Sequence, residues 1–188
     1  MRTGYDIDAL LSIEGNAYDK IHPVYLALSN VFDRTDLTDD ELPFHDAQFF
    51  RDYLMMSGFP RFCEPEYVAE FAAALNGLQT MEISCLEQFC KDARAALKDT
   101  GLFDDQENPV EDLDMDYEES VTVGERLSDQ FYDLVTSSEV DEELLRYLRR
   151  VVPSLRDRAT ADYLWIWTPD VERGYGGKSE TIPNPNKS

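Results

Sequence analysis

Apolar residues recur at helical spacing along the middle of the chain, between residues 49 and 97. After Pro65, the residues Val68, Phe71 and Leu75 take positions i, i+3 and i+7, which place side chains on one face of a helix. Two further stripes, before and after this one, have similar spacing. The pattern therefore predicts three amphipathic helices with buried positions Phe49, Phe50, Tyr53, Leu54, Val68, Phe71, Ala72, Leu75, Leu86, Phe89, Cys90, Ala93 and Leu97.

Small and polar residues mark where the helices are expected to begin and end. Ser-Gly at 57–58 and Asn-Gly at 76–77 predict helix ends, because glycine readily adopts the positive φ of a C-terminal cap. The segments 84–87 and 122–125 have the Ser/Thr-x-x-Glu pattern of a capping box and predict helix starts, with a start nearer Thr80 as the alternative for the first. Pro153 predicts the end of a helix that opens near residue 138, because proline lacks the N–H group that a helix interior uses.

Further helical stripes lie at 21–32, 127–135 and 144–152. The sequence therefore predicts an all-α fold, a single-domain multi-helix bundle over residues 1–167. Residues 104–119 are an acidic connecting segment that fits either a short strand or a loop. Residues 159–167 are apolar and aromatic and fit either a last helix or a strand. Residues 168–188 contain several Gly and Pro and little to bury, which predicts an irregular C-terminal tail.

Charge is distributed unevenly along the chain. Thirty-nine acidic residues oppose seventeen basic ones, a net charge of −22. Residues 99–143 hold seventeen acids and a single base, Arg126, whereas residues 144–188 carry a net charge of +3. This asymmetry predicts a specialised acidic surface. Direct nucleic-acid binding is not expected, because phosphate contacts need Lys and Arg.

A basic protein is the expected partner of this surface. The predicted partner-binding acids lie in the acidic segment and at the start of the following helices. They are Asp104, Asp105, Glu107, Glu111, Asp112, Asp114, Asp116, Glu118, Glu119, Glu139, Asp141, Glu142 and Glu143.

Motifs of catalysis and metal binding are missing from the sequence. It has no glycine-rich phosphate loop, no Gly-x-Ser-x-Gly elbow and no His-Glu-x-x-His pair. The pair His45-Asp46 occurs in some metal-dependent phosphohydrolase sites, but those sites need further ligands and His22 is the only other histidine. Cys63, Cys85 and Cys90 are odd in number and lack Cys-x-x-Cys spacing. We expect free thiols, no metal, no cofactor and no enzyme activity.

Long apolar segments are also missing. No apolar run is long enough to span a bilayer. The first residues lack the apolar segment of a signal peptide. The expectation is a cytoplasmic protein without membrane contact.

Four segments of the chain stand out together. They are Ala-Tyr-Asp-Lys-Ile-His-Pro-Val-Tyr at 17–25, Met-Ser-Gly-Phe-Pro-Arg-Phe at 56–62, residues 70–97, and Arg-Leu-Ser-Asp-Gln-Phe-Tyr-Asp at 126–133 followed by Leu-Leu-Arg-Tyr-Leu at 144–148. In order and spacing they resemble the bacterial family named after a DNA mimic protein. Members of that family usually show Asn-Gly-Gly-Phe followed by Gln-Phe, where this chain has Met56 and Ser57 in the first two positions and Arg61 in place of the Gln.

The resemblance implies an all-helical acidic protein. The founding member of the family is a dimer that occupies the DNA-binding face of a helix-turn-helix repressor. It therefore implies a basic DNA-binding partner, a role in transcription regulation and a possible homodimer. By the same resemblance, Gly58 and Phe59 are fold elements rather than parts of an active site.

Three hypotheses about function remain open at this point. The first is a DNA-mimicking protein that occupies the DNA-binding surface of a basic protein. The second is a salt-adapted acidic helical protein with an unknown interaction role, for example an immunity protein, since Asp outnumbers Glu by 22 to 17 and Arg outnumbers Lys by 12 to 5. The third is an enzyme, which no motif supports.

Overall fold

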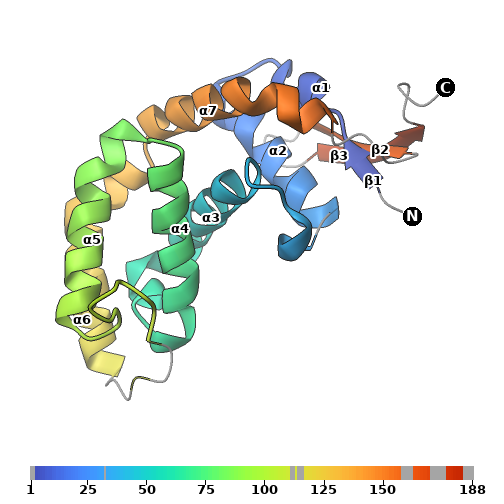
Figure 1. Ribbon diagram of the computed structural model, residues 1–188. Helices are drawn as coiled ribbons and strands as arrows, with labels where there is room; N and C mark the ends of the chain where they lie inside the picture. Colours follow the sequence, from blue (N-terminus) through green and yellow to red (C-terminus); the bar gives the residue numbers. More distant parts are fainter. Residues whose placement is uncertain are drawn as a thin grey trace. The chain divides into compact units, whose positions relative to one another are not determined.

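Helices dominate the computed structural model, which describes residues 3–31, 33–110, 113, 117–157, 163–169 and 177–183 (Figure 1). The all-α prediction is confirmed by seven α-helices among the described residues. Three 3₁₀ turns and three short strands complete the described elements. In chain order they are β1 (Thr3–Tyr5), α1 (Ile7–Leu11), α2 (Ala17–Val31), η1 (Arg34–Asp36), α3 (Leu42–Phe62), η2 (Pro65–Tyr67), α4 (Val68–Thr80), η3 (Ser84–Leu86), α5 (Glu87–Asp99), α6 (Tyr117–Val135), α7 (Ser138–Asp157), β2 (Tyr163–Pro169) and β3 (Gly177–Pro183).

Two compact units divide the chain. The central unit comprises residues 46–143 and contains most of α3, all of α4, α5 and α6, and the first turns of α7. The terminal unit comprises residues 1–45 and 144–188, and contains α1, α2, η1, the first residues of α3, the rest of α7 and the three strands. Each unit is described below by itself. The predicted domain boundary between residues 167 and 168 stays a prediction.

A cluster of phenylalanine rings forms the core of the central unit. Phe50 lies 4.8 Å from Phe62, 5.1 Å from Phe71 and 6.2 Å from Phe89, measured between ring centroids. These four side chains are at most 1% exposed. They come from α3, α4 and α5. The three helices predicted from apolar spacing therefore pack their apolar faces against one another. Within this unit, α4 and α5 run side by side and α6 lies behind α5 in the view of Figure 1.

Helix α3 is kinked at Gly58, as the Ser-Gly pair predicts. Gly58 has φ 74° and ψ 175°, a conformation that side chains with a Cβ rarely adopt. The kink brings the following backbone against α6. A Cβ atom on Gly124 would lie 2.3 Å from the Cα of Pro60, so α6 can make this close approach only with glycine at that position.

Helix α4 does not end at Asn76-Gly77, so that prediction is wrong. It continues to Thr80 and closes with a Schellman arrangement, in which Glu82 N donates to Gln79 O at 3.1 Å and Ile83 N donates to Leu78 O at 3.2 Å. Glu82 supplies the left-handed conformation, with φ 59°. Gly77 is buried inside the helix instead.

Two other predicted helix boundaries are also wrong. Thr122 does not start a helix, because α6 begins at Tyr117 and the Thr122 hydroxyl donates to Glu118 O at 2.8 Å within the helix. Pro153 does not end α7, which continues to Asp157. Val152 and Leu155 are buried in this last part of the helix, and their burial offsets the hydrogen bond that proline cannot make.

A three-stranded sheet stands in the terminal unit. Strand β2 is central, parallel to β1 and antiparallel to β3, with Leu164 opposite Ile182. The sequence fits either a helix or a strand at 159–167, and the described residues 163–167 form a strand. The prediction of an irregular tail is wrong for 177–183, because these residues form β3. Their sequence lacks an apolar pattern, and the pairing with β2 makes them a strand.

Candidate acidic interaction surface

The first predicted acid, Asp104, organises its own loop. Its carboxylate accepts hydrogen bonds from the backbone N–H groups of Gln106 and Asn108, each at 2.8 Å, and from the Asn108 side chain at 2.9 Å. Hydrogen bonds from the side chain and backbone of Asn108 lower the pKa of Asp104. A bridge between Phe103 and Pro109 closes the loop, so residues 104–110 of the acidic segment form an ordered turn, whereas residues 117–119 belong to α6.

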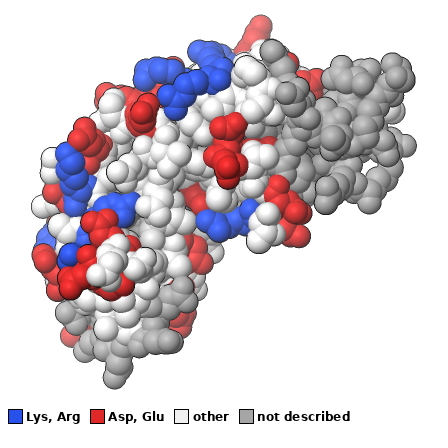
Figure 2. Space-filling view, in the orientation of Figure 1, with Lys and Arg blue, Asp and Glu red and all other residues white. Residues whose placement is uncertain are grey.

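The next two predicted acids face basic residues of α5. Asp105 lies 3.5 Å from the Nζ of Lys98, and Glu107 lies 3.0 Å from an Nη of Arg94. A third pair, Lys91 with Glu87 at 2.6 Å, follows the same helix. Figure 2 shows the result as acidic and basic side chains interleaved over this face of the central unit. Part of the acidic charge here is therefore offset within the chain.

Asp141 and Glu143 are buried, so the prediction that they belong to an exposed acidic surface is wrong. Asp141 is 7% exposed and pairs with Arg51, whose Nη2 lies 2.6 Å from Oδ1. Glu143 is 9% exposed, and its two oxygens accept hydrogen bonds from the backbone N–H and the hydroxyl of Ser84, each at 2.6 Å. Both carboxylates thus hold helices together.

The predicted capping box at 84–87 is wrong, because Ser84 contacts Glu143 instead. Ser84 does not cap a helix that starts beside it, since residues 84–86 form η3 and α5 starts at Glu87 without a side-chain cap. The hydroxyl of Ser84 is instead a donor to a carboxylate 59 positions away in sequence. A local motif cannot reveal such a partner.

Among the other predicted acids, Glu118, Glu139 and Glu142 are exposed on α6 and α7. The structure therefore leaves these three on the surface. The rest fall outside what the structure describes, as residues or as side chains: Glu111, Asp112, Asp114, Asp116 and Glu119. Their part in a surface stays a prediction.

Helix α6 carries a row of acids that the sequence analysis missed. Glu125, Asp129 and Asp133 are exposed and follow one another at intervals of four residues, with Glu118 seven residues before the first. Positions four apart lie on one face of a helix, about 6 Å apart along its axis. Among the described residues, no Lys or Arg forms an ion pair with Glu125, Asp129 or Asp133. The spacing of four was the signal in the sequence that could have revealed this row.

The His, Cys, Asp and Glu side chains of the described residues bear on the predictions about metal binding and thiol chemistry. No cluster of three or more His, Cys, Asp or Glu side chains suits a metal ion there. Burial raises the pKa of Cys63 to about 12 and that of Cys85 and Cys90 to about 11 each, so all three thiols stay protonated at neutral pH and are poor nucleophiles.

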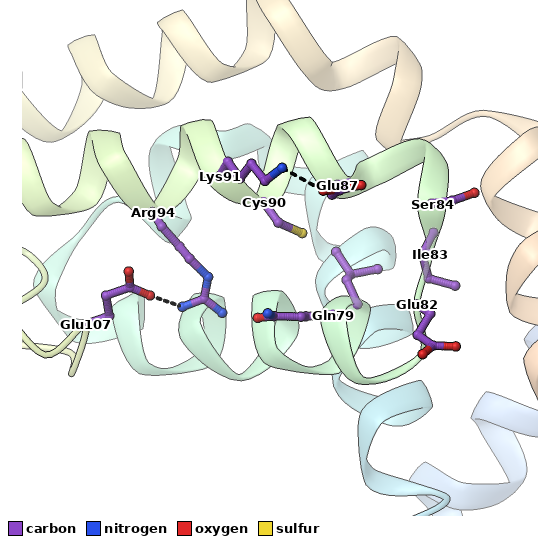
Figure 3. Close-up of a pocket in the computed structure, with 10 residues that line it drawn as sticks. Gln79, Glu82, Ile83, Ser84, Glu87, Cys90, Lys91, Arg94 and Glu107 are labelled. Carbon is purple, nitrogen blue, oxygen red and sulfur yellow. Dashed lines mark hydrogen bonds and ion pairs between the residues drawn. The ribbon is translucent and has the colours of Figure 1, made fainter.

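A cavity of about 550 Å³ lies between α4 and α5 in the central unit (Figure 3). Its lining includes three apolar side chains, two ion pairs, and the polar side chains of Gln79, Glu82 and Ser84. Its residues do not include any of the exposed acids on α6.

No helix among the described residues combines the length and apolar character needed to cross a membrane. Comparisons with protein-family models, with curated proteins and with solved structures gave no match.

Proposed function

We propose that this chain is an acidic binding protein that mimics DNA and occupies the DNA-binding surface of a basic protein. The exposed row of Glu125, Asp129 and Asp133 on α6 is the observation that carries the proposal. These carboxylates form no ion pairs with described basic residues, unlike those beside α5. They stand within the segment 99–143, whose net charge is −16.

The spacing of the row suits a surface that normally contacts phosphates. Four helical residues rise about 6 Å, and Glu118 extends the row to about 22 Å along α6. One strand of B-DNA carries a charge about every 3.4 Å of axis, so the row offers roughly half that density. The negative electrostatic potential of such a row attracts basic surfaces over about a Debye length.

The kind of partner comes from the resemblance to the DNA mimic family. It suggests a helix-turn-helix regulator, and with it a role in transcription regulation in the cytoplasm of a bacterium. Electrostatic complementarity would then set the association rate and the choice of partner. The shape of the interface would follow from α6.

The experiment compares two triple variants with equal changes in net charge. The test variant is Glu125→Gln/Asp129→Asn/Asp133→Asn, which removes the row on α6. The matched control replaces three exposed acids elsewhere in the central unit, as Glu66→Gln/Glu70→Gln/Asp99→Asn. Each protein competes with fluorescein-labelled operator DNA for a panel of purified helix-turn-helix regulators, read by fluorescence anisotropy over a range of salt concentrations.

Wild-type protein is expected to displace DNA from at least one regulator, less well as salt increases. The α6 variant should lose about tenfold or more in affinity and show a weaker salt dependence, because it lacks close charge pairs. The control should lose little. Equal losses in both variants would show that total charge, not its position, matters. If no regulator in the panel is displaced and stability rises steeply in molar salt, the salt-adapted alternative is favoured instead.

A further inference from the structure

The cavity between α4 and α5 has three apolar side chains in a lining that is otherwise polar and charged. They are Leu78, Ile83 and Cys90, which are 1%, 4% and 9% exposed. Figure 3 shows Arg94 reaching from α5 towards α4 at one end, with Cys90 directed between the two helices. A volume of about 550 Å³ is in the range of sites that hold small organic molecules.

Arg94 is the one charged group on this cavity that is largely withdrawn from solvent. Its side chain is 15% exposed, whereas Glu107 is 49%, Lys91 63% and Glu87 70% exposed. Glu82, the remaining charged residue in the lining, is also exposed. An ion pair strengthens as water is excluded, and exposed pairs are worth little. The charge that a ligand can use best in this cavity is therefore the guanidinium of Arg94.

Two of the N–H groups of the Arg94 guanidinium already have partners within the chain, and one of these partners is a carboxylate. Glu107 contacts Nη1 of Arg94 at 3.0 Å, and the Asn76 side-chain oxygen accepts from Nη2 at 2.7 Å. Glu107 makes this contact from a loop position with φ 63°, a left-handed conformation that is unfavourable for a residue other than glycine. A guanidinium has five N–H donors, so these two contacts leave further donors available.

We propose that this cavity binds a small apolar monocarboxylate, with its carboxylate on Arg94 and its hydrocarbon body against Leu78, Ile83 and Cys90. Glu107 is the internal competitor that the ligand displaces. At the guanidinium, the carboxylate of the ligand takes the place of the Glu107 carboxylate, so the ion pair with Arg94 stays one to one. A dianion such as a phosphate ester would add a charge beside Glu82 and Glu87. The negative field of the whole chain does not exclude a monoanion, because charges beyond about 8 Å are screened at physiological ionic strength.

The experiment compares hexanoate with hexylamine, 1-hexanol and hexyl phosphate, which share one body and differ in the head group. Binding to the full chain is measured from chemical-shift changes of the Leu78 and Ile83 methyl groups. Hexanoate is expected to bind more tightly than the other three. Arg94→Gln should weaken hexanoate binding about tenfold, because a charged hydrogen bond is lost from a shielded position.

The decisive variant is Glu107→Gln, which removes the competing charge. It should tighten hexanoate binding about two- to fivefold, as expected for release of a half-exposed ion pair. Glu70→Gln, an exposed acid of α4 outside the cavity lining, is the control and should leave the affinity unchanged. A role of Glu107 in loop structure alone would weaken binding or leave it unaltered. The proposal is overturned if Glu107→Gln does not tighten binding, if 1-hexanol or hexylamine binds as well as hexanoate, or if no methyl shift appears at millimolar hexanoate.

Discussion

Replacing Arg51 by methionine tests whether a single buried cation holds three helices of the central unit together. The guanidinium donates from Nε to the carbonyl of Val135 at 2.9 Å, from Nη1 to Gln48 at 3.1 Å and from Nη2 to Asp141 at 2.6 Å. Val135 is the last residue of α6, and Asp141 lies in the first turn of α7. The side chains of Arg51 and Asp141 are only 4% and 10% exposed.

The expected cost follows from what the methionine leaves behind. Asp141 would remain as a buried carboxylate without its cation, and removing one partner of a buried pair typically costs about 3–5 kcal/mol. The carbonyl of Val135 would also lose its charged donor. We therefore expect Arg51→Met to lower the free energy of unfolding by about 3–5 kcal/mol. That is a large share of the roughly 5–15 kcal/mol available to a typical domain.

Urea denaturation followed by circular dichroism measures this cost. The double variant Arg51→Met/Asp141→Leu removes both charges and should recover at least half of the loss, because apolar side chains can replace a buried pair at little cost. Lys91→Met is the matched control. It breaks an exposed pair with Glu87 and should change the free energy of unfolding by less than about 1 kcal/mol.

Two results would contradict this reasoning. One is a loss from Arg51→Met no larger than that from Lys91→Met. The other is additivity, in which the double variant loses the sum of the two single losses, because contacting residues with a shared interaction should be coupled.

Three shorter predictions concern other positions. Gly124→Ala should destabilise the fold by about 2 kcal/mol or more in thermal melts, because its Cβ would meet the Pro60 backbone at 2.3 Å, whereas Gly→Ala in an open helix is stabilising. Glu143→Ala should cost about 2–3 kcal/mol and speed hydrogen exchange at the Ser84 amide, which loses its acceptor; unchanged exchange would refute the contact. Burial raises the pKa of Cys63 to about 12 from an ordinary value of 9.0. The free energy of unfolding that depends on the protonated thiol is therefore complete below pH 9.0 and is lost as the pH rises towards 12. In urea titrations, Cys63→Ala should reduce this loss of stability at high pH.

Periodicity was enough to predict the helical core. Phe50, Phe71 and Phe89 lie in the interior as their spacing indicates. The kink at Gly58 also follows from the sequence, since only glycine takes φ 74° without strain. These features depend on neighbours within a few residues, and such neighbours can be identified from the sequence alone.

The charged positions were harder to predict, because a count of acids does not show which are buried. Asp141 stands four residues before Leu145 and so lies on the buried face of α7, a signal that was present in the sequence. Its partner Arg51, however, lies 90 positions away. Ser84 and Glu143 are likewise 59 positions apart. Such pairs depend on how helices pack, and no local pattern contains that information.

The three-way contact of Arg51 has a consequence for proteolysis. Thr136 and Ser137 form the short turn between α6 and α7, the kind of connection that proteases usually cut. A protease must first draw several residues of the turn out of the fold, and this would break the Arg51 contacts on both sides of it. Cleavage there should therefore require opening of the whole central unit, so its rate would report global rather than local stability.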